Sequence, residues 1–164
     1  MRRRQAGFTH IELILVVGII GIITALSTPM FLSYYQGAQL RVAAEEVVTF
    51  LNQGRQMAIT QNGLICVHIT STAMHITSTA MHYHLGGCGG ATWIGPGTDA
   101  GGNIAVPQGI TLLTTANPVF NYLGGTTQGA TYTITHTLSS KSVNVVVALS
   151  GRVCITPAAT TICS

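Results

Sequence analysis

The sequence predicts an α+β protein, with one long N-terminal helix followed by a head built on an antiparallel β-sheet. Three observations predict this class. Residues 13–30 form an uncharged apolar run, a helical period of apolar residues continues to about residue 62, and β-branched residues, glycine and threonine dominate afterwards. We therefore expect a helix over residues 8–62 and a β head over residues 63–164, which is long enough for one core.

Charge is scarce and unevenly placed. Charged residues make up 7% of the 164 residues, and the formal net charge is +3. Three of the seven basic residues, Arg2 to Arg4, precede the apolar run, so the remaining four basic residues balance the four acidic ones. The basic excess therefore belongs to the N-terminal segment and does not predict a nucleic-acid-binding face.

The apolar run has the length of a membrane span. Its 18 residues would reach about 27 Å as a helix, close to the hydrocarbon thickness of a bilayer. Because Arg2 to Arg4 precede it, we expect a single-pass protein with a cytoplasmic N-terminus and with everything after Ser33 outside. A simple membrane anchor would also explain this run.

A cleaved secretory signal is an alternative of another class. Ala25-Leu26-Ser27 offers the small residues that signal peptidase accepts. The mature chain would then begin at Thr28 and would be a soluble secreted β domain.

A single carboxylate, Glu12, stands at the edge of the apolar run within Gly7-Phe8-Thr9-His10-Ile11-Glu12. Near the membrane centre it would cost about 2.5–3.5 kcal/mol, so it needs a cationic partner and is a functional candidate. The short basic leader, the glycine, the glutamate and the apolar helix together resemble the type IV prepilin family, although that family usually has leucine where His10 stands.

The resemblance implies a set of functional residues. Residues 1–7 would be a leader that prepilin peptidase removes after Gly7, with N-methylation of the new first residue, Phe8. Glu12 would pair with the N-terminal amine of a neighbouring subunit during assembly, and Pro29 would kink the helix. The resemblance also implies an inner-membrane location before assembly, an inner-membrane assembly platform, and incorporation with other pilin or pseudopilin subunits into an extracytoplasmic filament.

The periodicity after Pro29 predicts which helix face is buried. Leu40, Ala44, Val47, Leu51 and Ala58 share one stripe, which we expect to pack on the head, and Asn62-Gly63 should end the helix. The expected strands, read from β-branched runs between turn residues, are 64–69, 77–84, 110–114, 119–122, 130–137, 142–149 and 152–156, with a long surface loop over 86–102.

A short duplication interrupts this pattern. The segment ITSTAMH occurs at 69–75 and again at 76–82. An odd shift of seven residues would turn equivalent side chains to opposite faces of one continuous strand. We therefore expect a hairpin, bulge or loop between the two copies, with no function that the sequence demonstrates.

The C-terminal part, Gly151-Arg152-Val153-Cys154 after an apolar strand, resembles the GspH/FimT family of minor pilins and pseudopilins. Some members of that family bind DNA through Gly-Arg-x-Arg, whereas Cys154 occupies the second arginine position here. A DNA-binding minor pilin for natural transformation is thus an alternative, with Arg152 and Lys141 as contacts and Trp93 as a stacking residue.

The four cysteines predict disulfides in an oxidising compartment, since no pair has C-x-x-C spacing. Three connectivities are possible, and proximity in the sequence favours Cys66 with Cys88 and Cys154 with Cys163.

Catalysis and metal binding receive less support. His82 and His84 share one face of a strand, with His75 and Cys88 nearby, a set that could hold Zn²⁺ or Cu²⁺. The head has a single acid, Asp99, and no nucleophile or phosphate-binding motif. We therefore expect no enzyme activity, no metal site and no cofactor.

Overall fold

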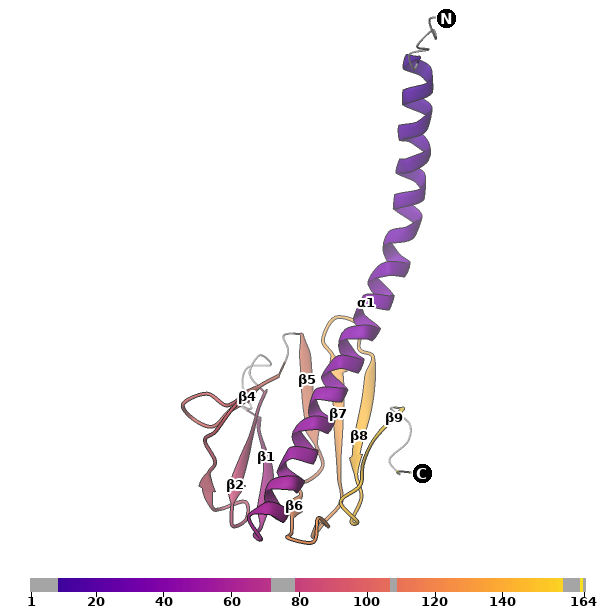
Figure 1. The fold of residues 1–164 in the computed structure, drawn as a ribbon. Coiled ribbons are helices and arrows are strands. Elements are labelled where there is room, and N and C mark those ends of the chain that lie inside the picture. Colours follow the sequence, from indigo (N-terminus) through magenta and orange to yellow (C-terminus); the bar gives the residue numbers. More distant parts are fainter. Residues whose placement is uncertain (1–8, 72–78, 107–108, 158–162, 164) are drawn as a thin grey trace, which may run out of the picture. The chain divides into compact units, whose positions relative to one another are not determined.

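The computed structural model describes residues 9–71, 79–106, 109–157 and 163. Its chain divides into two compact units, Met1–Gln36 and Gly37–Ser164. Helix α1 (His10–Thr60) runs through both units, and strands β1 to β9 all lie in the second (Figure 1). The predicted α+β class, a long N-terminal helix followed by antiparallel sheets, is confirmed.

Local sequence signals explain both ends of α1. Thr9 precedes the first helical residue, its carbonyl accepts a 3.2 Å bond from Leu13 N–H, and Glu12 lies three residues further on. Threonine and glutamate at this spacing are the sequence signature of a capping box, and the Thr9 hydroxyl donates to the Glu12 carboxylate at 3.5 Å. At the other end Asn62 adopts φ +49°, and Gly63 N–H donates to the Ala58 carbonyl, which closes the helix.

The helix continues through Pro29. Proline has no N–H group, so the carbonyl of Ala25 receives no helical hydrogen bond from this position. The kink expected at Pro29 stays a prediction.

The strands form two antiparallel sheets. In the first sheet the order is β3-β2-β1-β6, and β4 also pairs with β2; in the second it is β5-β7-β8-β9. The strand bounds are β1 Ile65–Ser71, β2 Thr79–Leu85, β3 Ala91–Thr92, β4 Ile104–Ala105, β5 Ile110–Thr114, β6 Val119–Phe120, β7 Ala130–His136, β8 Ser142–Val147 and β9 Val153–Pro157.

The second half of α1 packs on the sheets through the predicted stripe. All five of its residues, Leu40, Ala44, Val47, Leu51 and Ala58, are buried in a core shared with both sheets. Such burial of one helix face is the main source of helix stability in a protein.

Tyr83 packs the first sheet against the helix. Its ring stacks on Phe50 with centroids 4.2 Å apart, and its hydroxyl donates a 2.8 Å bond to the Phe50 carbonyl. One turn later, Gly54 leaves room for this ring, because a Cβ there would lie 3.0 Å from side-chain atoms of Tyr83 and Val67. Burial raises the pKa of the Tyr83 hydroxyl far above its usual range.

The structure corrects three expectations drawn from the sequence. The expected surface loop over 86–102 contains β3, and β4 follows it, since both short strands pair with β2. Trp93 is half-buried against the core, with its ring edge-on to Tyr83 at 5.7 Å, and is not a free stacking platform. Strand β6 ends at Phe120, before the expected 122.

The described parts of the two copies lie in neighbouring strands. Ile69 of the first copy pairs with Met81 of the second, in the antiparallel register of β1 and β2. The segment between these strands, residues 72–78, lies outside the described residues.

Candidate functional site

The first half of α1 presents apolar side chains on all sides. In the single chain its large side chains are exposed, from Ile11, 72% exposed, to Tyr35, 51% exposed. By its length and composition α1 can cross a membrane, and it is the one helix of the described ranges that can. The full set is Ile11, Leu13, Ile14, Leu15, Val16, Val17, Ile19, Ile20, Ile22, Ile23, Leu26, Met30, Phe31, Leu32, Tyr34 and Tyr35.

A surface of this kind has a definite physical requirement. A helix that is apolar all round is stable in lipid or among other helices, whereas an exposed apolar patch of this size in water is an interaction site. The second half of α1 differs, since one face, which includes the stripe, is buried and most of the exposed side chains on its other faces are polar.

Glu12 lies at the start of this apolar surface. Its side chain is exposed and accepts a 3.5 Å hydrogen bond from Thr9 Oγ1. Within the part of the chain that the structure describes, no ion pair reaches Glu12, and the one ion pair joins Arg41 to Glu45. Gly7 and Phe8 lie outside the described residues, so the predicted cleavage and methylation site has no structural account.

The predicted DNA contacts do not form one basic cluster. Lys141 precedes β8 and Arg152 precedes β9, at opposite ends of the β8–β9 pair. Six residues of strand separate the two ends of β8, which corresponds to about 20 Å. Arg55 lies nearer to Arg152. Its Nε is 3.3 Å from the point where a Cβ added to Gly151, the neighbour of Arg152, would lie.

Both disulfides have the connectivity that sequence proximity favoured. Cys66 of β1 is bonded to Cys88, with Cα atoms 4.9 Å apart, and Cys154 of β9 is bonded to Cys163, with Cα atoms 5.9 Å apart. The first disulfide holds the loop after β2 against the sheet, and the second fastens the C-terminal segment to the last strand.

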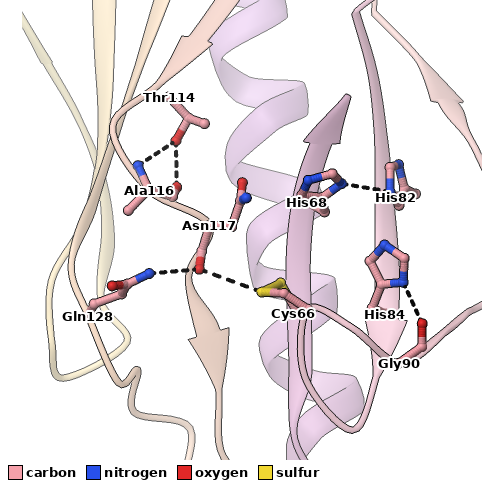
Figure 2. The surroundings of a disulfide bond; sticks show 10 residues. Cys66, His68, His82, His84, Gly90, Thr114, Ala116, Asn117 and Gln128 are labelled. Atoms are coloured by element: carbon pink, nitrogen blue, oxygen red, sulfur yellow. Dashed lines mark hydrogen bonds between the residues drawn. A yellow bond between two sulfur atoms is a disulfide. The ribbon is translucent and has the colours of Figure 1, made fainter. Parts of the chain in front are cut away.

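Three histidines meet on the first sheet. His68 of β1 lies opposite His82 of β2 in the register, and His84 lies two residues further along β2 (Figure 2). His68 Nδ1 is 2.9 Å from His82 Nε2, and the three ring centroids are 4.8 to 5.6 Å apart. We call His68, His82 and His84 the histidine cluster.

The electrostatics of the histidine cluster favour neutral rings at His68 and His82. Burial, followed by the charges of neighbouring histidines, lowers the pKa of both His68 and His82. The Nδ1 of His84 lies 2.9 Å from the Gly90 carbonyl. A carbonyl only accepts hydrogen bonds, so the Nδ1 of His84 carries a proton and Nε2 is the nitrogen that faces away from this bond.

Sequence reasoning missed His68. It considered His82 and His84 with His75 and Cys88, but Cys88 is in a disulfide and His75 lies outside the described residues. A signal was present, since histidine recurs at 68, 75 and 82. The antiparallel register of β1 and β2 places His68 opposite His82, although the two residues are 14 positions apart in the sequence.

Comparison with known proteins gives a match at the level of structure only. No protein-family model matches the sequence, and no curated protein matches it. The crystal structure of the type IV minor pilin FimU of Pseudomonas aeruginosa is similar, with a TM-score of 0.52, 14% identity, and coverage of 79% of this chain and 96% of FimU.

A second similar structure comes from a secretion machine. The minor pseudopilin EpsH of the type 2 secretion system of Vibrio cholerae aligns with a TM-score of 0.54 and 12% identity, over 73% of this chain and 97% of EpsH. Together with the long apolar helix and the two antiparallel sheets, these similarities show that the chain has the fold of the type IV minor pilins and minor pseudopilins.

Proposed function

We propose that this chain is a minor pilin or pseudopilin, a non-enzymatic structural subunit of a type IV pilus or of a type II secretion-like filament. The observation that supports it most is the apolar half of α1, which is exposed on all sides in a chain whose second unit has its own core. The FimU and EpsH folds support the same role.

Assembly would exchange one apolar environment for another. Before assembly the apolar half of α1 lies in the inner membrane, with residues 1–7 in the cytoplasm and the head outside. Removal of the leader by prepilin peptidase frees Phe8, and the assembly platform transfers the helix into a bundle of other subunits. Lipid tails are as apolar as leucine, so this transfer gains little from the hydrophobic effect, and polar contacts have to specify the position of each subunit.

We assign to Glu12 the polar contact that specifies the position of the subunit. Glu12 is the only acidic residue before Glu45, and a buried charge that requires a partner is well suited to setting register. We assign to it the N-terminal amine of a neighbouring subunit as its partner.

The mature N-terminus tests the proposal directly. We expect N-terminal sequencing and mass spectrometry of the membrane-bound protein to give Phe8, carrying one added methyl group. A Gly7→Leu variant, which blocks the peptidase, should keep Met1. A chain that begins at Thr28 and is released into the medium would replace the proposal with a secreted β domain, and an unprocessed wild-type chain would indicate a simple anchor.

The alternative, a DNA-binding minor pilin for natural transformation, depends on Arg152 and Lys141. Because these residues lie at opposite ends of β8, we expect at most two separated phosphate contacts. The affinity of the full chain in detergent for duplex DNA should then be weak, and log K should fall with log salt with a slope of about −2 or shallower. Tight binding at physiological salt that Arg152→Ala and Lys141→Ala both abolish would establish the alternative.

A further inference from the structure

We propose that the histidine cluster, His68, His82 and His84, binds one divalent transition-metal ion of the kind that prefers imidazole, Zn²⁺ or Cu²⁺. This site is independent of filament assembly. It lies on the face of the first sheet opposite to the one covered by α1 (Figure 2). Val67 and Tyr83 pack against Gly54 of α1. Side chains alternate between the two faces along a strand, so the adjacent histidines point away from the helix.

The register of two paired strands holds the three rings in place. His68 and His82 are directly opposite each other, and His82 and His84 are two residues apart, so all three side chains leave the same face. One possible ligand atom from each ring lies within 4.8 Å of the others. In a tetrahedral zinc site the nitrogens are about 3.3 Å apart, as follows from Zn–N bonds of about 2.0–2.1 Å. Small side-chain rotations bring the rings to that spacing.

The hydrogen bonds around the cluster already orient its ligands. His84 donates through Nδ1 to the Gly90 carbonyl and therefore presents Nε2. Metal-binding histidines usually make this kind of bond, which fixes the tautomer and the ring orientation. The loop that supplies Gly90 is tied to β1 by the Cys66–Cys88 disulfide, and Cys66 lies opposite His84 in the register.

The donor set selects the type of ion. The nearby sulfurs of Cys66 and Cys88 are in a disulfide, and Asp99 accepts hydrogen bonds from Gly101 N–H and Asn103 N–H in its own turn. The cluster therefore offers imidazole nitrogens without carboxylates. Imidazole suits zinc and copper, whereas calcium and magnesium require several oxygen ligands. Three histidines leave a fourth position for water.

The test is a metal titration of the full chain in detergent, freed of metal by dialysis against a chelator. Calorimetry with ZnCl₂, and separately with CuCl₂, should give one ion bound per chain. We expect His84→Gln and His82→Gln to lower the affinity at least tenfold. His10→Gln, which removes an exposed histidine from the start of α1, should leave it unchanged.

A second measurement separates loss of a ligand from loss of the fold. His84 is only half-buried, so His84→Gln should melt at the temperature of the metal-free wild type, and added metal should raise the melting temperature of the wild type alone. X-ray absorption of the loaded wild type should show imidazole ligands. Absence of stoichiometric binding, or wild-type affinity in a folded His84→Gln variant, would overturn the proposal.

Discussion

Replacement of Glu12 by glutamine is expected to leave membrane insertion and cleavage after Gly7 intact while incorporation into filaments is lost. In the proposed assembly the carboxylate of Glu12 neutralises the N-terminal amine of a neighbouring subunit within an apolar bundle. Removal of one partner leaves the other charge buried and unpaired, at a cost of about 3–5 kcal/mol. This corresponds to a loss of about a hundredfold or more in the incorporation equilibrium.

A pair of variants distinguishes the charge of Glu12 from its local role. Glu12 also stands three residues after Thr9, at the acidic position of the capping-box sequence, and accepts a hydrogen bond from the Thr9 hydroxyl. Glutamine serves equally well at this position of a capping box, whereas alanine removes both functions. If the charge is used, Glu12→Gln and Glu12→Ala should fail alike. Normal incorporation of Glu12→Gln with failure of Glu12→Ala would assign the effect to the helix end.

The measurement is the amount of subunit in sheared filaments relative to the amount in the membrane, determined by quantitative immunoblot. Glu46→Gln is a matched control, because it removes an exposed acid from the second half of the same helix. It should be incorporated at the wild-type level. Wild-type incorporation of both Glu12 variants would contradict the assembly role.

Substitution of Gly151 by alanine is expected to cause a large loss of stability in the head. Gly151 adopts φ +78° in the turn between β8 and β9, where its N–H donates a 2.8 Å bond to the Ala148 carbonyl. An alanine Cβ would overlap the carbonyl oxygen of Gly124 and lie 2.9 Å from its carbonyl carbon. The clash is with backbone, so no side-chain rotation relieves it, and the backbone strain itself costs about 1–3 kcal/mol.

The turn that Gly151 approaches has to move as well. Residues 121–125 are held by Asn121 N–H bonded to the Gly125 carbonyl and by Gly124 N–H bonded to the Asn121 carbonyl. We expect the free energy of unfolding to fall by about 3 kcal/mol or more. Denaturant unfolding of the full chain in detergent, followed by Trp93 fluorescence, measures it. Gly89→Ala should cause no loss, because nothing lies within 4 Å of its added Cβ; equal stability of both variants would contradict this account.

Glycine at 151 thus has a structural reason that needs no DNA. The resemblance to Gly-Arg-x-Arg drew attention to Gly151 and Arg152 as a binding motif. In the structure the glycine permits a tight turn and a close approach of two backbones, and Arg152 follows it at the exposed start of β9. The stability of Gly151→Ala and the DNA affinity of Arg152→Ala can therefore be measured as separate properties.

Part of the fold could be predicted from local periodicity and from single residues. The apolar run, the buried stripe of α1, the end of the helix just before Asn62-Gly63 and the main strands follow from the spacing of apolar residues and from turn chemistry. These patterns are visible in a linear chain because each is set by neighbours within one or two turns or by alternation along one strand.

Contacts between residues that are distant in the sequence could not be predicted in this way. Strands β3 and β4 are two residues each and exist because β2 offers them hydrogen-bonding partners. The antiparallel register brings His68 to His82, while the length of β8 separates Lys141 from Arg152. The physical reason is that strand pairing joins residues through hydrogen bonds across the sheet, and a shift of one residue in the register would turn every side chain to the other face.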